Sequence, residues 1–369
     1  MIRELLTIVF VSQISYFHNK IINSMSKNTD YSVSIIIPTF NEEKFIERCV
    51  NSVLAQSYPC QQMDIMIVDG ESTDKTCELV QTLSTAHPNI RLINNPKRIQ
   101  SAAFNIGVQA SDAPYIIRLD AHATYDKHYI ERCIALLESH PEFGNVGGIW
   151  DVLPQNESLI ARANALLNHL KFGIGGADFR VGTKAQETDS VPFGAFPRKV
   201  LNEIGGMRED LARGEDNEYN SRIRKAGYKI WLDPAIRSSY YARPTLRSSC
   251  RQMYANGQSI GQLFYVDRKA IGLRHLVPLA FVMALIVSSI LAIFSIYGCY
   301  MLGFILAAYI LAALAADIDA CRKNGWNYFF ILPVLFFCVH ASYGLGTIVG
   351  LLTFSKQSRD NLGTKTSQF

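Results

Sequence analysis

Closely spaced cysteine pairs are absent from this sequence of 369 residues: its eight cysteines are scattered, with no Cys-x-x-Cys among them. Zinc fingers and ribbons need such pairs, so we expect reduced thiols, with neither structural zinc nor disulfides. A strong charge of one sign is also missing, because the net charge is only +4 and no basic stripe is interleaved with aromatic residues. The low net charge and the missing stripe argue against nucleic-acid binding. Internal repeats and low-complexity tracts are lacking too.

Charged residues are missing from long stretches near the C-terminus. Leu276 to Tyr297 contains no charged residue, and neither does Cys299 to Ala316, which follows almost at once. The first stretch is long enough to cross a bilayer as a helix, and the second nearly so. Together they predict a tight transmembrane hairpin around Gly298.

A third uncharged stretch, Tyr328 to Phe354, allows two interpretations. It has the length of a membrane span, but a proline, a histidine and several glycines interrupt it. Gly344, Gly346 and Gly350 lower its helix propensity. It is therefore either a third transmembrane helix or a re-entrant segment.

Basic residues beside these stretches predict an orientation. Arg268, Lys269 and Arg274 precede the first stretch, and Arg322 and Lys323 lie between the second and the third. Lys and Arg concentrate in cytoplasmic loops, so the large N-terminal part is expected in the cytoplasm. The side of the C-terminal tail stays open, because three spans place it outside whereas its own basic residues favour the inside.

Composition divides the chain into four predicted parts. Residues 1–31 form a leader or surface helix, since their apolar stretch, Leu5 to Val11, is too short to span a membrane and lacks a cleavage site for secretion. Residues 32–265 mix charged, apolar and turn residues as a soluble domain does. Residues 266–354 form the membrane region with two to three helices, and residues 355–369 form a tail.

Strand-like and helix-like segments alternate in the first half of the soluble part. Each short apolar run is followed by a segment with apolar residues near the helical period. The pairs are Val33 to Ile37 with Glu42 to Ala55, Ile65 to Val68 with Lys75 to Leu83, Arg91 to Ile93 with Ser101 to Val108, and Tyr115 to Leu119 with Asp126 to Leu137. This alternation predicts an α/β fold with a mostly parallel, doubly wound sheet, whose ligands bind beyond the carboxyl ends of the strands.

Polar motifs follow three of the predicted strands. They are Pro38-Thr39-Phe40-Asn41-Glu42, Asp69-Gly70-Glu71-Ser72-Thr73-Asp74 and Asp120-Ala121-His122. Any one of them fits ordinary turn and cap chemistry, but three at the same edge of a sheet predict a site. Asp69 and Asp120 suit a nucleotide plus a metal: one carboxylate accepts from a base or ribose group, and the other holds a cation on a diphosphate.

Together with Gly214-Glu215-Asp216, these motifs resemble the family 2 inverting glycosyltransferases with the GT-A fold, a Rossmann-like domain, over roughly Ser32 to Arg251. The Asp-Ala-His variant and the C-terminal membrane region are most similar to bacterial succinoglycan-type exopolysaccharide glucosyltransferases. The resemblance implies transfer of a sugar from a nucleotide-sugar donor, a UDP-sugar, to a lipid-linked (polyprenyl diphosphate) saccharide. It also implies a place in the bacterial inner (plasma) membrane, with the catalytic domain in the cytoplasm.

The resemblance implies a role for each matching residue. Donor contacts are expected from Pro38, Thr39, Asn41, Glu42, Asp69, Ser72 and Asp120, a Mn2+ or Mg2+ site at Asp120 and His122, and catalysis by Glu215 and Asp216, with Asp216 as the base. The base takes a proton from the acceptor hydroxyl as it attacks the anomeric carbon, without a covalent enzyme intermediate. His122 stands where the family often has Asp, so it is either a nitrogen ligand or a hydrogen-bonding residue at the rim.

Further candidates are less specific. Arg98 precedes a helix N-terminus, where anions bind, and is a nucleotide or phosphate contact or a solvated arginine. Phe193 and Gly194 are expected on the acceptor side. Arg251 and Tyr254 either close over the diphosphate or belong to an amphipathic segment on the membrane surface.

Two alternative functions stay open. A processive polysaccharide synthase would use the same chemistry, but the Gln-x-x-Arg-Trp motif of such enzymes is missing after Arg247 and the spans are few. A non-catalytic scaffold that binds a nucleotide sugar is suggested by His122 in the metal motif. The scaffold interpretation predicts that Asp216→Asn leaves cellular function intact.

Overall fold

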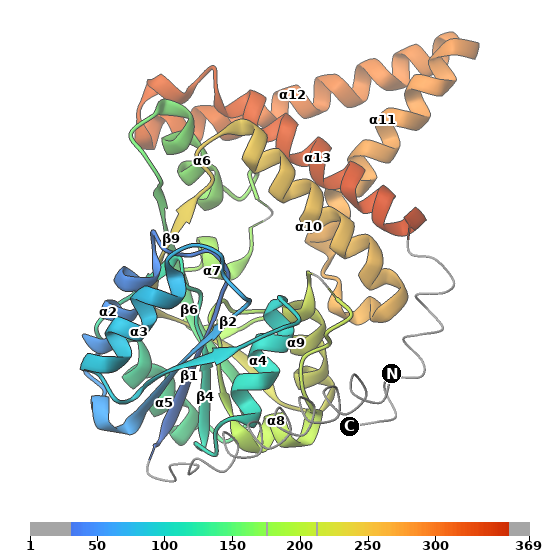
Figure 1. Ribbon diagram of the computed structural model, residues 1–369. Coiled ribbons are helices and arrows are strands. Elements are labelled where there is room, and N and C mark those ends of the chain that lie inside the picture. The colour runs from blue at the N-terminus through green and yellow to red at the C-terminus, as the bar shows by residue number, and fades with distance from the viewer. Residues whose placement is uncertain (1–30, 175, 212, 354–369) are drawn as a thin grey trace, which may run out of the picture.

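A mixed sheet of nine strands forms the centre of the N-terminal part of the chain (Figure 1). The computed structural model describes residues 31–353 except 175 and 212, so the predicted leader and tail lie outside the described residues. The strand order is β3-β2-β1-β4-β8-β6-β9-β5, with β7 paired to β9. The strands are β1 (Val33–Thr39), β2 (Met63–Asp69), β3 (Ile90–Asn94), β4 (Tyr115–Arg118), β5 (Ala123–Tyr125), β6 (Phe143–Pro154), β7 (Gln186–Glu187), β8 (Ala195–Pro197) and β9 (Lys229–Ala242).

Helices cover both faces of this sheet. The helices of the sheet domain are α2 (Ile46–Leu54), α3 (Thr76–Ala86), α4 (Gln100–Gln109), α5 (Tyr129–Ser139), α6 (Leu159–His169), α7 (Asp178–Val181), α8 (Arg198–Ile204) and α9 (Glu215–Lys225), with a 3-10 turn, η1 (Cys60–Gln62), before β2. Figure 1 shows α2, α3 and α5 on one side and α4, α8 and α9 on the other. Strand β1 is buried on both faces: Ile35 and Ile37 join the core beneath α2 and α5, whereas Ile36 joins the core beneath α4. Double coverage explains why the first strands are unbroken apolar runs.

The first half of the sheet is parallel, as the alternation predicts. Strands β3, β2, β1 and β4 are parallel neighbours. The second half differs from a mostly parallel sheet, because β8 is antiparallel to both β4 and β6, and β5 and β7 are antiparallel to β9. Only β6 and β9 return to a parallel pairing there. The chain after Phe143 thus completes the sheet with strands that come from distant segments.

A block of long helices follows the sheet domain and lies above it in Figure 1. It consists of α10 (Leu246–Val266), α11 (Leu276–Phe294), α12 (Ile296–Asn324) and α13 (Leu332–Thr353), with 3-10 turns η2 (Arg268–Ala270), η3 (Leu273–His275) and η4 (Trp326–Tyr328) between them. Leu273–Phe294, Ile296–Asn324 and Leu332–Thr353 are long and apolar enough to cross a membrane. The predicted hairpin is present, but the break lies at Ser295. Gly298 sits in the first turn of α12, where an added Cβ would lie 2.3 Å from the backbone of α11.

The third apolar stretch is one continuous helix from Leu332, and its glycines are packing positions. Helix α13 lies along α10, with backbone against backbone. A Cβ at Gly257 of α10 would lie 2.0 Å from the Tyr343 carbonyl oxygen, and one at Gly346 of α13 would lie 2.1 Å from the Tyr254 oxygen. At Gly261 and Gly350, one turn further along, a Cβ would lie 2.4 and 2.1 Å from a carbonyl oxygen of the opposite helix. Small residues four apart on both helices permit this close approach. The low helix propensity of glycine gives no indication of this packing role.

Candidate active site

The polar rim lies where the strand order reverses. Strand β1 is flanked by β2, which leads to β3, and by β4, which leads to the rest of the sheet. In this register Thr39 is paired with Asp69, and Ile36 is paired with Arg118. Ligands of open α/β sheets bind at such a switch point, beyond the carboxyl ends of the strands. The sequence motifs that follow β1, β2 and β4 therefore meet at one edge, as predicted.

Asp69 holds together the loop that follows β2. Its carboxylate accepts hydrogen bonds from the Ser72 backbone N–H at 2.8 Å, from the Ser72 hydroxyl at 2.6 Å and from the Thr39 hydroxyl at 3.3 Å. Asn41 ties this loop to the end of β1, because its N–H donates to Ser72 Oγ and its Oδ1 accepts from the Thr73 N–H, both at 2.8 Å. The two motifs thus form one linked structure, in which Asp69 is only 4% exposed.

Strained backbone is concentrated at this rim. Among the described residues, the non-glycine residues with positive φ are Asn41 (56°), Glu71 (59°), Arg98 (56°) and Phe193 (48°). Asn41, Glu71 and Arg98 lie in the loops after β1, β2 and β3, and Arg98 Nε donates to Glu71 Oε2 at 3.0 Å. Such conformations cost about 1 to 3 kcal/mol each and accumulate at functional sites.

Asp120 and His122 follow β4 on the same rim. His122 Nδ1 lies 3.3 Å from Glu42 Oε1. Burial by itself would lower the pKa of His122, but the hydrogen bond with Glu42 and the negative charge of Asp120 outweigh it and raise the pKa. Because Nδ1 faces Glu42, Nε2 is the nitrogen left for another ligand.

Arg118, the last residue of β4, links the two acidic motifs. Its Nη2 lies 3.7 Å from Asp120 Oδ1 and 3.7 Å from Glu215 Oε1, and it donates to Gln100 Oε1 at 2.8 Å. Its Nε is buried without a hydrogen-bond partner. Burial opposes the charge of Arg118, yet the surrounding carboxylates raise its pKa. We overlooked Arg118 in the sequence because it ends an apolar strand; a single charge in such a run is the signal that could have found it.

Glu215 and Asp216 form the first turn of α9, after Gly214 with φ 78°. Glu215 is 7% exposed and Asp216 is exposed. Burial raises the pKa of Glu215 to about 7, and the charges of Asp216 and Asp120 add to this effect, while Arg118 opposes it. Asp216 Oδ1 accepts from the Asn217 N–H at 2.8 Å. The pair thus combines a buried, readily protonated carboxyl with an exposed one.

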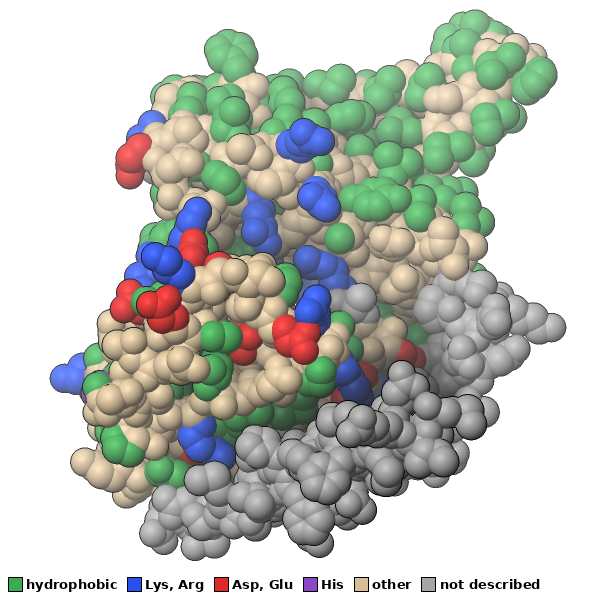
Figure 2. All heavy atoms as spheres, in the orientation of Figure 1, with side chains coloured by type: hydrophobic (Ala, Val, Ile, Leu, Met, Phe, Trp, Pro, Cys, Tyr) green, Lys and Arg blue, Asp and Glu red, His purple; other side chains and the backbone are tan. Residues whose placement is uncertain are grey.

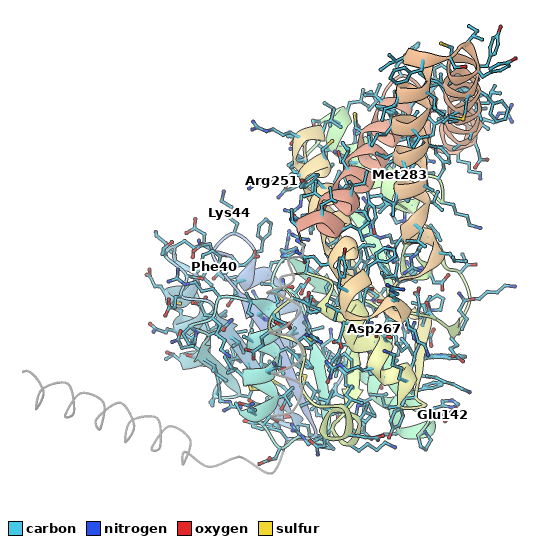
Figure 3. All side chains as sticks on the ribbon, turned by 90° about the vertical axis from the view of Figure 1, so that its right-hand side faces the viewer. Phe40, Lys44, Glu142, Arg251, Asp267 and Met283 are labelled. Carbon is cyan, nitrogen blue, oxygen red and sulfur yellow. The ribbon has the colours of Figure 1, made fainter. Side chains whose placement is uncertain are left out.

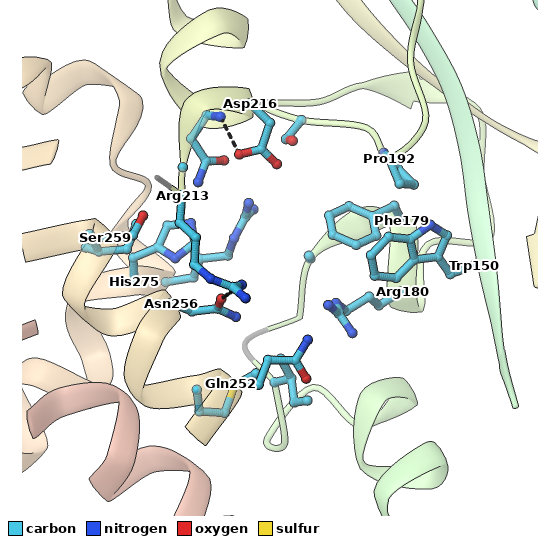
Figure 4. Close-up of a pocket in the computed structure, with 18 of the residues that line it drawn as sticks. Trp150, Phe179, Arg180, Pro192, Arg213, Asp216, Gln252, Asn256, Ser259 and His275 are labelled. Carbon is cyan, nitrogen blue, oxygen red and sulfur yellow. Dashed lines mark hydrogen bonds between the residues drawn. The ribbon is translucent and has the colours of Figure 1, made fainter. Parts of the chain in front are cut away.

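A cavity of about 950 Å³ contains these groups (Figure 4). Of the predicted residues, those that line it are Arg98, Asp120, His122, Phe193, Gly194, Glu215 and Asp216. A smaller neighbouring pocket of about 190 Å³ shares Arg98, Asp120 and His122 with it and adds Pro38, Thr39 and Glu42. In Figure 4, Asp216 and Arg213 lie at one end of the cavity and Arg180 beside Trp150 across from them.

Comparison with known proteins assigns the family. The family model described as "Glycosyl transferase family 2" matches residues 34–205. Succinoglycan biosynthesis protein ExoA of Rhizobium meliloti is 32% identical over 259 residues, which are 70% of this chain and 77% of that protein. The chain belongs to glycosyltransferase family 2. A Methanococcus voltae relative, dolichyl N-acetyl-alpha-D-glucosaminyl phosphate 3-beta-D-2,3-diacetamido-2,3-dideoxy-beta-D-glucuronosyltransferase, is 29% identical and covers 87% of this chain and 97% of its own length.

A solved structure shares the fold of this glycosyltransferase. Mannosyltransferase PcManGT from Pyrobaculum calidifontis, in complex with GDP-Man and Mn2+, superposes with a TM-score of 0.56 at 17% identity, covering 93% of this chain and 95% of that one. The likeness shows the fold alone. The sheet domain is thus a GT-A fold, followed by three helices that could span a membrane.

Packing explains why this glycosyltransferase has phenylalanine at position 193 and glycine at position 194. The Phe193 ring packs 5.4 Å from that of Tyr125 and 5.5 Å from that of Trp150, and is 7% exposed. At Gly194 a Cβ would lie 2.2 Å from Asn145 Oδ1. Glycine at position 194 therefore lets Asn145 reach the cavity wall. The aromatic ring is mostly core, so little of its face is left for stacking on a sugar.

Some predicted residues line neither cavity: Asn41, Asp69 and Ser72, which build the loop described above, and Arg251 and Tyr254 of α10. Figure 3 shows Arg251 with the C-terminal helices, whereas Phe40 and Lys44 lie on the sheet domain below. The face of α10 that lines the large cavity carries Gln252, Met253 and Asn256 instead. Closure of Arg251 or Tyr254 over a diphosphate stays a prediction.

Replacement of Glu215 by Gln is expected to change how stability depends on pH. The folded pKa of about 7 exceeds the ordinary 4.5, so the folded state holds an extra proton between these values and loses stability as the pH rises through them. Glu215→Gln removes this loss, which amounts to at most about 3 kcal/mol. Thermal unfolding at pH 5 and pH 8 should show a smaller fall for the variant than for the wild type. Parallel falls in both proteins would contradict the raised pKa.

Proposed function

We propose that this chain is a membrane-anchored, metal-dependent inverting glycosyltransferase that moves a sugar from a UDP-sugar to a lipid-linked saccharide on the cytoplasmic face of the plasma membrane. The acceptor is a growing exopolysaccharide or surface glycan. One observation carries the proposal: a single cavity is lined both by the acidic residues of the GT-A domain, among them Asp120 and Asp216, and by residues of the apolar helices, among them Phe281 and Tyr309.

Asp216 is the base in this proposal because it is the exposed carboxylate of the pair. As the acceptor oxygen attacks the anomeric carbon, Asp216 takes the hydroxyl proton, and the bond from that carbon to the nucleoside diphosphate breaks. Arg118 lies next to both acidic motifs and has an unpartnered Nε, so it can bind an oxygen of the departing diphosphate. Glu215 positions Arg118 through their ion pair.

The residues on the rim fit a divalent cation that the donor helps to hold. No cluster of three or more His, Cys, Asp or Glu suited to a metal exists among residues 31–353 outside the two gaps. Asp120 and His122 are therefore a partial set, which suits Mg2+ or Mn2+ because these ions commonly take further ligands from water and substrate phosphates. A bound cation would neutralise charge on the leaving diphosphate.

The relatives support the lipid-linked acceptor. The name of the M. voltae enzyme describes a transfer to a dolichyl phosphate that carries N-acetylglucosamine, and the R. meliloti protein is named for succinoglycan biosynthesis. The apolar helices of this chain would hold its cavity at the surface where such lipids reside.

Release of nucleoside diphosphate tests the proposal. Detergent-purified protein is incubated with a panel of nucleotide sugars, Mn2+ or Mg2+ and a membrane lipid extract. We expect release from a UDP-sugar only when both the cation and the lipid extract are present, and loss of release on addition of a chelator. Equal release with a soluble sugar acceptor alone would contradict the lipid acceptor, and metal-independent release would contradict the cation.

A further inference from the structure

Arg180 is a cation of the cavity without an anionic partner. It lies on α7, and its guanidinium stacks 4.8 Å from the Trp150 ring and 5.3 Å from the Phe179 ring. Its Nη1 donates to Asn168 Oδ1. No Asp or Glu among the described residues lies within ion-pairing distance of it, and burial lowers its pKa to about 10. A charge held in protein without a counter-charge is costly, so this arrangement favours an anionic ligand.

The whole cavity carries an excess of positive charge. Seven cationic side chains line it, against three carboxylates, which are those of Asp120, Glu215 and Asp216. Arg98 and Arg274 have further carboxylate partners outside the lining, Glu71 and Asp189, so seven cations face five carboxylates. The cationic residues are Arg98, Arg118, Lys171, Arg180, Arg213, Arg243 and Arg274. Figure 2 shows Lys and Arg side chains gathered along the waist between the sheet domain and the C-terminal helices. The donor's diphosphate and one divalent cation on the rim do not remove this excess, because their opposite charges largely cancel each other.

The segment that carries Arg180 is docked onto the apolar helices. Phe172 packs with ring centroids 5.1 Å from Phe336 of α13, and the Gly173 carbonyl lies 2.9 Å from His340 Nε2. Both Lys171 and Arg180 belong to this segment, which runs from the end of α6 to the end of α7. Arg180 therefore belongs to the side of the cavity that faces the apolar helices.

An apolar wall completes this side of the cavity. Val277, Pro278 and Phe281 of α11 line it, together with Tyr309 of α12 and Val339 of α13. The rings of Phe281 and Tyr309 stack with centroids 4.4 Å apart. A ligand at Arg180 thus meets a cation and an apolar wall on the same side of the cavity, which suits an anionic head joined to an apolar chain.

We propose that Arg180 binds the phosphate or diphosphate group of the lipid-linked acceptor, while the chain of the lipid leaves along the wall formed by α11, α12 and α13. The proposal rests on the proposed function for the identity of the acceptor. The planar guanidinium, fixed against Trp150, presents paired donors to phosphate oxygens. Arg180 is thereby an acceptor-binding residue, separate from the donor rim at Asp120 and His122.

Equilibrium binding of farnesyl diphosphate to the purified full-length protein tests this site without turnover. We expect Arg180→Gln to raise the Kd for farnesyl diphosphate by about 10-fold or more, because a charge-assisted contact is lost. Arg180→Lys, which keeps the charge without the paired donors, should give a smaller rise. The Kd for UDP should stay within about 2-fold in both variants, which also verifies that they are folded.

Controls separate the possible sources of the effect. Arg237→Gln is the matched variant, because Arg237 pairs with Asp151 at 2.9 Å and lines neither cavity; it should bind farnesyl diphosphate as the wild type does. Inorganic diphosphate should bind more weakly than farnesyl diphosphate, and equal binding would overturn the lipid assignment. An unchanged Kd in Arg180→Gln, or an equal loss of UDP binding, would overturn the role of Arg180. Absence of sugar transfer from the wild type, with this binding intact, would count against the proposed function instead.

Discussion

Asp216→Asn is expected to reduce sugar transfer by at least about 100-fold, the usual contribution of a general base. The amide has the shape of the carboxylate and can still accept the 2.8 Å hydrogen bond from the Asn217 N–H, so the start of α9 should be preserved. What it cannot do is take the proton from the acceptor hydroxyl. Initial rates of nucleoside diphosphate release, with lipid acceptor present, measure the loss.

Asp233→Asn is the matched control for this variant. Asp233 also accepts a backbone N–H at 2.8 Å, from Ala235, but it lines neither cavity. We expect wild-type rates from it, and wild-type affinity for UDP from Asp216→Asn. An Asp216→Asn enzyme that kept more than about a tenth of the rate would remove Asp216 from the role of base and leave Glu215 as the candidate.

Gly257→Ala is expected to destabilise the protein although it adds a single methyl group. The new Cβ would lie 2.0 Å from the Tyr343 carbonyl oxygen, so α10 and α13 would have to move apart. Overpacking of this kind costs about 1 to 3 kcal/mol. Thermal unfolding in detergent should show a midpoint lower by a few degrees, about 2 to 4 °C per kcal/mol.

Gly303→Ala provides the comparison within the same helical block. A Cβ at Gly303 of α12 would meet nothing within 4 Å, so no loss of stability is expected. Gly346→Ala, which acts from the opposite side of the same contact, should resemble Gly257→Ala, since its Cβ would lie 2.1 Å from the Tyr254 oxygen. Equal midpoints for Gly257→Ala and Gly303→Ala would show that the two helices are not closely packed.

Local patterns predicted the first half of the fold because its structure is local. Strands β1, β2 and β4 are buried on both faces, so their sequences are apolar runs. In the helices between the strands, apolar residues recur near the helical period. The second half is built from pairings such as Ile117 with Ala195, which join residues far apart in the chain. No periodicity encodes such a pairing, so the antiparallel strands were not foreseen.

The site divides in the same way. The loops after β1, β2 and β4 were predictable, because polar turn residues at strand ends stand out in the sequence. Arg118 and Arg180 were not, because their importance comes from what surrounds them: two carboxylates in one case, and aromatic rings without a carboxylate in the other. The glycines of α13 were interpreted as a weakness of the helix, since their partners on α10 are invisible to a local pattern.

The backbone contact between α10 and α13 also fixes the position of the cavity relative to the apolar helices. Helix α10 supplies Gln252 and Met253 to the cavity wall, and the same helix is joined through Gly257 and Gly261 to an apolar helix. If the apolar helices cross a bilayer as we propose, this contact holds the cavity at a fixed distance from the membrane. On the proposed function, an acceptor whose sugars span that distance would present its terminal hydroxyl to Asp216, and a shorter or longer one would not. Where a glycan is built one sugar at a time, such an enzyme would select acceptors by the length of their saccharide.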